Sequence, residues 1–365
     1  MEICNAMKGL GGRSGICALV LGLAASVSSA APTSAPVATL PYTVKVFAQV
    51  PQGLSQPDSM ELWNDNVFVG FQNRVAKDGT DGKSSTIVEF GLDGKVKRTF
   101  TVPGHNDGLR MVGDDDLWAL QNEDANPNLV VIQLRTGTQK QYKFPPAPHK
   151  GGYDDLVVKN GKVFVTASNP DVSGTGGINS FPALVRLSLG GNNTVVVESV
   201  LHGNDNATNI ATGETKPLNL SDPDSLTIDP RGNIVLDSQA DSELVFIRHP
   251  FTSQQEVGLL NITSSVTGPM SATITLDDTA FANNPKAFLL VADVGNATDN
   301  GVIYRIDSPS FGFEPGVAYS ASDTLGLLGT LNLDTGFVTP IVTGFDSARG
   351  LLFIAPDGDN GGDDK

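Results

Sequence analysis

The amino-acid sequence predicts an all-β protein, a β-propeller of six four-stranded blades, with five blades as the alternative. Three observations predict this fold. The chain has almost no helical periodicity, it repeats a strand-rich pattern every ~45 to 50 residues, and its 40 Gly and 22 Pro favour short strands joined by tight turns. The sheet formed by one repeat cannot bury its faces alone, so neighbouring repeats are expected to stack around a central channel.

The first thirty residues predict a secretory signal peptide. Lys8 and Arg13 precede an apolar run at residues 16–27, and Ala30 closes a small-residue cleavage motif. That run has about a dozen residues, short of the roughly 20 that a membrane span requires. We therefore expect a secreted chain, extracellular or periplasmic, without a membrane span. Both cysteines lie inside this segment, so the mature chain would hold no disulfide and no cysteine metal site.

Composition divides the rest of the chain into three parts. Residues 31–41 are small and Pro-rich, which indicates a linker before the fold. Residues 42–356 carry the repeats and form the predicted propeller. Residues 357–365 consist of Gly and Asp with one Asn and one Lys, which predicts a disordered acidic tail.

Five repeats can be traced along the chain. Four of them begin at an aspartate followed by Ser, Gly or Asp and then an apolar residue. The four aspartates are Asp58, Asp107, Asp154 and Asp224. The fifth repeat begins less clearly near Ser271 and is expected to continue through strands at 287–296 and 301–307. Each repeat gives an inner strand after the acidic residue and three further strands outside it.

The two ends of the propeller region are expected to close the ring. Residues 42–50 and 345–356 both have strand character, and an unpaired sheet edge invites aggregation, so they should pair in the last blade. Three irregular segments interrupt the repeats, at 170–182, 204–221 and 308–324. We expect these to be loops that cap one face of the ring.

The formal net charge of −16 argues against binding to nucleic acid or to anionic membranes. Solubility outside the cell is the simplest explanation of this acidity. The alternative is that carboxylates gather locally and bind cations.

The aspartates at the start of the repeats are the main candidates for chemistry. Because inner strands of a propeller open at one mouth of the channel, Asp58, Asp107, Asp154 with Asp155, Asp224 and Asp346 are expected to converge there. Carboxylates crowded in a channel raise one another's pKa unless a cation joins them, and Ca²⁺ first or Mg²⁺ second would suit oxygen ligands. The alternative is turn chemistry, in which each Asp bonds its own backbone two residues on.

Other polar groups stand beside these aspartates. His105 is next to Asn106 and Asp107, and a histidine beside a carboxylate can act as a general base, although a surface-loop histidine is the alternative. Tyr153 and Arg349 add unlike polar groups at the same mouth, where Arg349 could instead pair with a carboxylate. The chain contains neither a G-x-S-x-G nucleophile motif nor an H-E-x-x-H zinc motif.

Residues 223–239, 106–111 and 344–358 resemble senescence marker protein/gluconolactonase and NHL-type propellers, and the likeness in fold covers residues 42–356. It extends to secreted bacterial propellers of unassigned function. In the calcium-dependent lactonases of that group, a channel ion is held by a Glu, an Asn and an Asp of a P-D-G-type motif, and a further Asn contacts substrate. The resemblance implies Asp224 for that Asp and Asn106 for the substrate contact. The Glu and the first Asn fall at Asp58 and Asp154, which differ from the family pattern but keep oxygen ligands.

Two functional hypotheses follow. The first is an exported hydrolase in which a channel cation, Ca²⁺ or another divalent ion, assists cleavage of an ester or lactone. Its predicted residues are Asp58, Asp154 and Asp224 as metal ligands, Asp107 and His105 for catalysis, and Asn106, Tyr153 and Arg349 for substrate binding. The second is a non-enzymatic, monomeric propeller whose loops bind a small molecule, a carbohydrate or another protein. A quinone-dependent dehydrogenase is disfavoured, because the chain has only two tryptophans.

Overall fold

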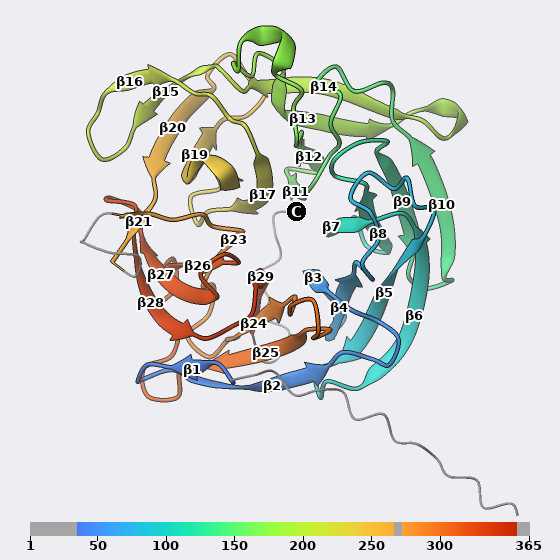
Figure 1. Ribbon diagram of the computed structural model, residues 1–365, viewed down its shortest axis with the longest axis vertical. Coiled ribbons are helices and arrows are strands. Elements are labelled where there is room, and N and C mark those ends of the chain that lie inside the picture. Colours follow the sequence, from blue (N-terminus) through green and yellow to red (C-terminus); the bar gives the residue numbers. More distant parts are fainter. Residues whose placement is uncertain (1–34, 266–271, 356–365) are drawn as a thin grey trace, which may run out of the picture. The chain divides into compact units, whose positions relative to one another are not determined.

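The computed structural model describes residues 35–265 and 272–355, which form six antiparallel sheets arranged as blades around a central axis (Figure 1). The six-bladed all-β propeller predicted from the repeats is therefore confirmed. The predicted signal peptide and acidic tail lie outside the described residues. Among the residues described, no helix has the length and apolar character needed to cross a membrane.

Blades 1 to 4 follow the chain in order, each from its inner to its outer strand. Blade 1 contains β3 (Pro57–Trp63), β4 (Asn66–Phe71), β5 (Ser84–Gly91) and β6 (Val96–Pro103). Blade 2 contains β7 (Asn106–Val112), β8 (Asp116–Gln121), β9 (Asn128–Gln133) and β10 (Thr138–Lys143). Blade 3 contains β11 (Leu156–Lys159), β12 (Lys162–Thr166), β13 (Pro182–Leu189) and β14 (Val195–His202). Blade 4 contains β17 (Pro223–Ile228), β18 (Ile234–Ser238), β19 (Glu243–Arg248) and β20 (Glu256–Asn261).

The predicted loops 170–182 and 204–221 lie between these strands. The first contains η1 (Ser173–Thr175). The second forms a hairpin, β15 (Asn206–Asn209) and β16 (Thr215–Pro217), which extends the outer edge of blade 4 because β15 pairs in parallel with β20. Two further 3₁₀ turns are η2 (Gly191–Asn193) and η3 (Gln239–Asp241).

The chain alternates between blades 5 and 6: after the first strand of blade 5 it forms two strands of blade 6 and then returns to blade 5. This order corrects the predicted fifth repeat. Blade 5 contains β23 (Asp278–Phe281), β26 (Ala318–Ser322), β27 (Leu327–Asn332) and β28 (Phe337–Thr343). Three short strands, β1 (Val37–Ala38), β21 (Thr263–Ser264) and β22 (Ala272–Thr273), extend its outer edge. Blade 6 contains β29 (Ala348–Ile354), β24 (Phe288–Asp293), β25 (Val302–Asp307) and β2 (Thr43–Gln49).

Two predictions about this region therefore need correction. The strands at 287–296 and 301–307 belong to blade 6, not to the fifth blade, because β24 pairs with β29 and β25 pairs with β2. Segment 308–324, predicted as a capping loop, contains β26, the second strand of blade 5. The two end segments do close the ring as expected, although each pairs with the β24–β25 hairpin and not with the other.

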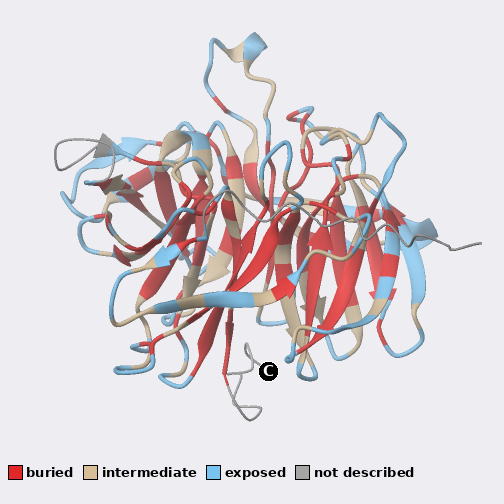
Figure 2. Ribbon diagram, turned by 60° about the horizontal axis from the view of Figure 1, so that its bottom comes forward, coloured by how far each residue is buried: buried red, intermediate tan, exposed pale blue. Residues whose placement is uncertain are grey.

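The core consists of six hydrophobic clusters, one between each pair of neighbouring blades. Side chains alternate between the two faces of a strand, so consecutive residues serve different clusters. In β4, Val67 and Val69 pack toward blade 6, whereas Phe68 packs toward blade 2. Figure 2 shows the resulting pattern, with buried residues along the strands and exposed ones concentrated in the loops. Burial on both faces of each sheet fixes the blades around the axis.

The inner strands are β3, β7, β11, β17, β23 and β29, which surround the centre in Figure 1. Hydrogen bonds between neighbouring blades connect the N-terminal parts of these inner strands. The Oδ2 atom of Asp155 accepts the N–H of Leu226 at 2.9 Å, and Asp278 accepts the N–H of Leu351 at 2.7 Å. These two aspartates therefore have a structural role, which places the starts of the inner strands close together.

Candidate metal centre

Each blade presents one charged side chain at the same position of its inner strand. The position lies two residues before a buried residue of that strand, and its six occupants are Asp58, Asp107, Asp154, Asp224, Asp277 and Arg349. All six line one cavity of about 630 Å³, including the open space at its mouth. The expected convergence of Asp58, Asp107, Asp154 and Asp224 is thus present.

The sixth position is occupied by an arginine, not by the expected Asp346. The structure places Asp346 before β29, where its N–H donates to Oδ2 of Asp293 at 3.1 Å. It is not among the residues that line the cavity. Asp277, which precedes β23, takes the fifth position that the sequence repeat left unclear.

The cavity has a large excess of negative charge. Its lining includes ten carboxyl groups and two cationic side chains, Lys77 and Arg349. Burial raises the pKa of Asp154, Asp224 and Asp277 well above the ordinary value, and neighbouring carboxylates add to this rise. The crowding of buried carboxyl groups therefore favours their protonated form, and a bound cation would oppose that effect.

Arg349 neutralises one side of the cavity. Its Nη1 atom lies 3.2 Å from Oδ2 of Asp58, its Nε atom 3.6 Å from Asp277, and its Nη2 atom 3.9 Å from Asp323. Asp58 also accepts a hydrogen bond from Gln72 Nε2 at 2.5 Å. Arg349 therefore pairs with carboxylates, which was the alternative that the sequence left open. The carboxylate of Asp58 is bound by Arg349 and Gln72.

The opposite side contains a group of three carboxylates. Glu123, Asp154 and Asp224 each offer an oxygen, and these oxygens lie within 4.8 Å of one another. Burial raises the pKa of Asp154, and the charge of Asp107 and the nearby Asp224 carboxyl add to the rise. Two of the three predicted metal ligands therefore come together with Glu123, whereas Asp58 lies with Arg349.

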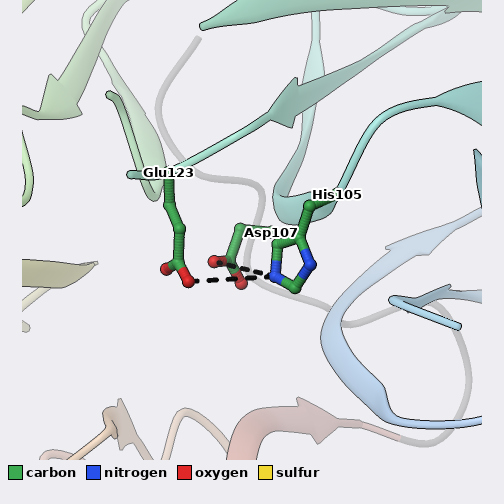
Figure 3. A group of neighbouring side chains, drawn as sticks. All are labelled: His105, Asp107 and Glu123. Carbon is green, nitrogen blue, oxygen red and sulfur yellow. Dashed lines mark ion pairs between the residues drawn. The ribbon is translucent and has the colours of Figure 1, made fainter. Parts of the chain in front are cut away.

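A second group shares Glu123 with the first. His105, Asp107 and Glu123 also offer ligand atoms within 4.8 Å of one another, and Figure 3 shows the imidazole facing both carboxyl groups. Burial raises the pKa of Asp107 well above its ordinary value, and the charge of Glu123 adds to the rise. Burial alone would raise the pKa of Glu123, but a hydrogen bond from Asp107 and the ammonium of Lys77 lower it below its ordinary value.

Two predicted substrate-binding residues do not reach the cavity. Asn106 is completely buried, and its Nδ2 atom donates to the carbonyl of Leu120 at 2.9 Å. Tyr153 is 1% exposed and stacks on Phe144 with ring centroids 4.5 Å apart, and burial raises its pKa to about 12. Neither residue is part of the cavity lining, so their predicted roles gain no support from the geometry.

Sequence reasoning did not single out Glu123, Lys77 or Asp277 as site residues. Glu123 follows β8, the second strand of blade 2, where the chain returns to the mouth beside the start of the inner strand. Polar residues stand one place earlier in other blades, at the position equivalent to Asn122: Gln72 after β4, Ser168 after β12 and Gln239 after β18. The end of the second strand is thus a repeat position that sequence analysis could have tested.

Comparison with known proteins finds solved structures of low sequence identity to this chain. No family model and no curated protein matches the chain. Virginiamycin B lyase from Staphylococcus aureus is 11% identical, with a TM-score of 0.47, covering 82% of this chain and 88% of that one. A putative gluconolactonase is 12% identical, with a TM-score of 0.48 and 87% of each chain covered. The periplasmic gluconolactonase of Pseudomonas aeruginosa is 12% identical, with a TM-score of 0.47, covering 82% of this chain and 88% of that one.

Proposed function

We propose that the channel mouth binds a divalent cation between Glu123, Asp154 and Asp224, and that the protein uses it to hydrolyse an ester or lactone. The observation that carries this proposal is the meeting of three carboxylate oxygens within 4.8 Å on the side of the cavity that Arg349 does not neutralise. The signal-like first thirty residues support an exported location, where extracellular modules bind Ca²⁺ weakly.

The residues present fit a hard cation. Ca²⁺ takes six to eight oxygen ligands in flexible geometry, and carboxylates are its commonest charged ligands. Burial raises the pKa of both Asp154 and Asp224, and a cation bound between them would favour the ionised carboxylates and remove the repulsion between them. Asp222 and Ser225 also line the cavity and supply further oxygens. Ca²⁺ is therefore the first cation to test, and Mg²⁺ and Mn²⁺ follow.

A divalent cation would polarise a substrate carbonyl and lower the pKa of a water bound to it. The chain's own residues supply the rest. Glu123, Asp154 and Asp224 hold the cation, and Arg349 keeps the charge on Asp58 and Asp277 balanced. Asp107 and His105, the residues predicted from the sequence as general bases, lie close to Glu123.

A titration of chelator-treated protein with Ca²⁺ tests the proposal. A ligand at 100 times its dissociation constant stabilises the folded state by about 2.7 kcal/mol, which a thermal-shift measurement detects. Asp224→Asn should abolish this stabilisation. Asp93→Asn, in an exposed turn outside the cavity, should preserve it and serves as the matched control. No stabilisation of the wild-type protein by Ca²⁺, Mg²⁺ or Mn²⁺ would refute the proposed cation site.

The catalytic part of the proposal needs its own assay. The cation-loaded protein is expected to hydrolyse lactones or aryl esters, and Asp224→Asn should remove that activity. Cation-dependent stabilisation with no hydrolysis of either class would instead assign the cavity to ligand binding, the alternative predicted from the sequence.

A further inference from the structure

His105 has one ring nitrogen with a partner and one without. Its Nδ1 atom lies 2.9 Å from the carbonyl oxygen of Val75, and a carbonyl can only accept, so Nδ1 carries the hydrogen. In the neutral ring Nε2 then presents a lone pair. Nε2 has no hydrogen-bond partner among the described residues, although His105 is only 3% exposed. Buried polar atoms are rarely left in this state, so the lone pair requires an explanation.

The lone pair faces two carboxyl groups. Nε2 lies 4.0 Å from Oδ2 of Asp107 and 3.8 Å from Oε1 of Glu123, too far for hydrogen bonds (Figure 3). One cation placed between these atoms could contact all three, because the ligand atoms lie within 4.8 Å of one another. The two distances from Nε2 are thus too long for direct hydrogen bonds but leave space for an ion between the three groups. The imidazole is already oriented by Val75, as second-shell carbonyls orient metal-binding histidines.

We propose that His105, Asp107 and Glu123 form a second divalent-cation site, so that Glu123 is shared by two ions. Asp107 and Glu123 line the cavity, whereas His105 contributes from outside its lining. The inference rests on the proposed function only in placing the first ion between Glu123, Asp154 and Asp224. The two sites differ in chemistry. The first offers only oxygen, whereas an imidazole nitrogen favours a first-row transition metal such as Zn²⁺ over Ca²⁺. His105 and Asp107 are then metal ligands, in place of the proton-transfer role predicted from the sequence.

The ammonium of Lys77 occupies the position beside Glu123 at which the second cation would bind. It contacts Oε1 of Glu123, the same oxygen that faces Nε2 of His105. Lys77 comes from the β4–β5 loop of blade 1, and its side chain is 51% exposed, so it can swing into solvent when an ion binds. The second site therefore exchanges a tethered monovalent cation for a divalent one.

Electron paramagnetic resonance of bound Cu²⁺ tests for the nitrogen ligand. Untagged, metal-stripped protein with one equivalent of Cu²⁺ should show nitrogen hyperfine coupling. His105→Asn should lose the coupling, while its amide nitrogen can still donate to the carbonyl of Val75 and so maintain the fold. His202→Asn, which removes a half-exposed histidine outside the cavity, is the control and should keep the coupling. Coupling that persists in His105→Asn, or is absent from the wild type, would overturn the proposal.

A second variant gives a readout in the opposite direction. Lys77→Met should tighten Zn²⁺ binding measured by calorimetry roughly tenfold, because the ion no longer competes with an ammonium. Lys83→Met removes an exposed lysine of the same loop that pairs with Asp81, and it should leave the affinity unchanged. Equal Zn²⁺ affinity in wild type and Lys77→Met would contradict the placement of the ion against Glu123.

The two sites can fail separately. Asp224→Asn should abolish stabilisation by Ca²⁺ but leave the copper–nitrogen coupling intact. Coupling without any Ca²⁺ response in the wild-type protein would refute the first site and support the second. Loss of the coupling in Asp224→Asn would refute a site formed by His105, Asp107 and Glu123 alone.

Discussion

The pH dependence of stability offers a direct test of the electrostatics in the cavity. Asp278 lies at the start of β23, where its Oδ2 atom accepts the N–H of Leu351 from blade 6. Burial raises its pKa from 3.8 to about 7, and the charge of Asp155 adds to the rise. In the unfolded chain the carboxyl loses its proton near pH 4, whereas in the folded protein it keeps the proton to about pH 7.

The sign of the effect follows from proton binding. Between those two values the folded state binds more protons than the unfolded state, so the free energy of unfolding falls as pH rises. A pKa change of this size corresponds to about 4 kcal/mol in full. Because Asp278 retains some exposed surface, we expect the free energy of unfolding to fall by about 2 to 4 kcal/mol between pH 4 and 8.

Asp278→Asn removes this titration and keeps one acceptor oxygen for the N–H of Leu351, but it loses the hydrogen bond that Oδ1 accepts from the N–H of Thr279 at 2.7 Å. Relative to the wild type, the variant should therefore gain about 2 to 4 kcal/mol of stability between pH 5 and pH 8, whatever the constant cost of the lost bond. Urea unfolding of metal-free protein at several pH values measures the difference. Asp93→Asn, in an exposed turn, is the control that should show no gain at pH 8. A wild type more stable at pH 8 than at pH 5, or an equal gain at both, would refute the reasoning.

Three further predictions concern packing and cation binding. Gly350→Ala should cost about 2 kcal/mol of stability in urea unfolding, because its Cβ would lie 2.3 Å from a carbonyl oxygen of blade 1, whereas Gly174→Ala meets nothing within 4 Å and should be neutral. Asp155→Ala should cost about 1 to 3 kcal/mol at pH 5, since it leaves a blade-to-blade N–H without its acceptor, and an unchanged midpoint would contradict this. Ca²⁺ should bind more weakly at pH 5 than at pH 8, with proton release detectable by calorimetry in two buffers, because Asp154 and Asp224 have raised pKa values and must deprotonate.

The repeat in the sequence predicted the ring of aspartates because inner-strand position is encoded locally. In blades 1, 2 and 4 the acidic residue is followed by a small residue and then by the apolar residue that enters the core. This short motif fixes both the start of the inner strand and the direction of the acidic side chain. Asp58, Asp107 and Asp224 were found in this way, and Asp154 follows the same spacing.

The last blade could not be assigned from the same motif. The sequence around Asp346 resembles the motif around Asp224, since both aspartates are followed by Ser. Register decides against it, because β29 begins at Ala348 and places Arg349 at the common position. The backbone beside Asp346 is held by Asp293, a residue of β24 far away in sequence. Only the pairing of distant strands reveals that arrangement.

The alternation of the chain between blades 5 and 6 could not be predicted from the sequence for a similar reason. Residues 288–293 form a fully buried run, which suits the interior of any blade. Hydrophobic pattern predicts such a strand but does not say which sheet it joins, because that choice depends on contacts with β2 and β29 at opposite ends of the chain. The existence of the strands was therefore predictable, and their partners were not.

Arg349 explains why the candidate cation sites lie where they do. Six carboxylates around one channel would repel equally and would define no preferred position for an ion. Replacement of one by arginine divides the ring, since its guanidinium faces Asp58, Asp277 and Asp323 at 3.2 to 3.9 Å. Negative charge then remains in excess on the other side, around Glu123. Cations should collect on that side because, among the residues that line the cavity, Lys77 is the only counter-ion there, through its ammonium beside Glu123.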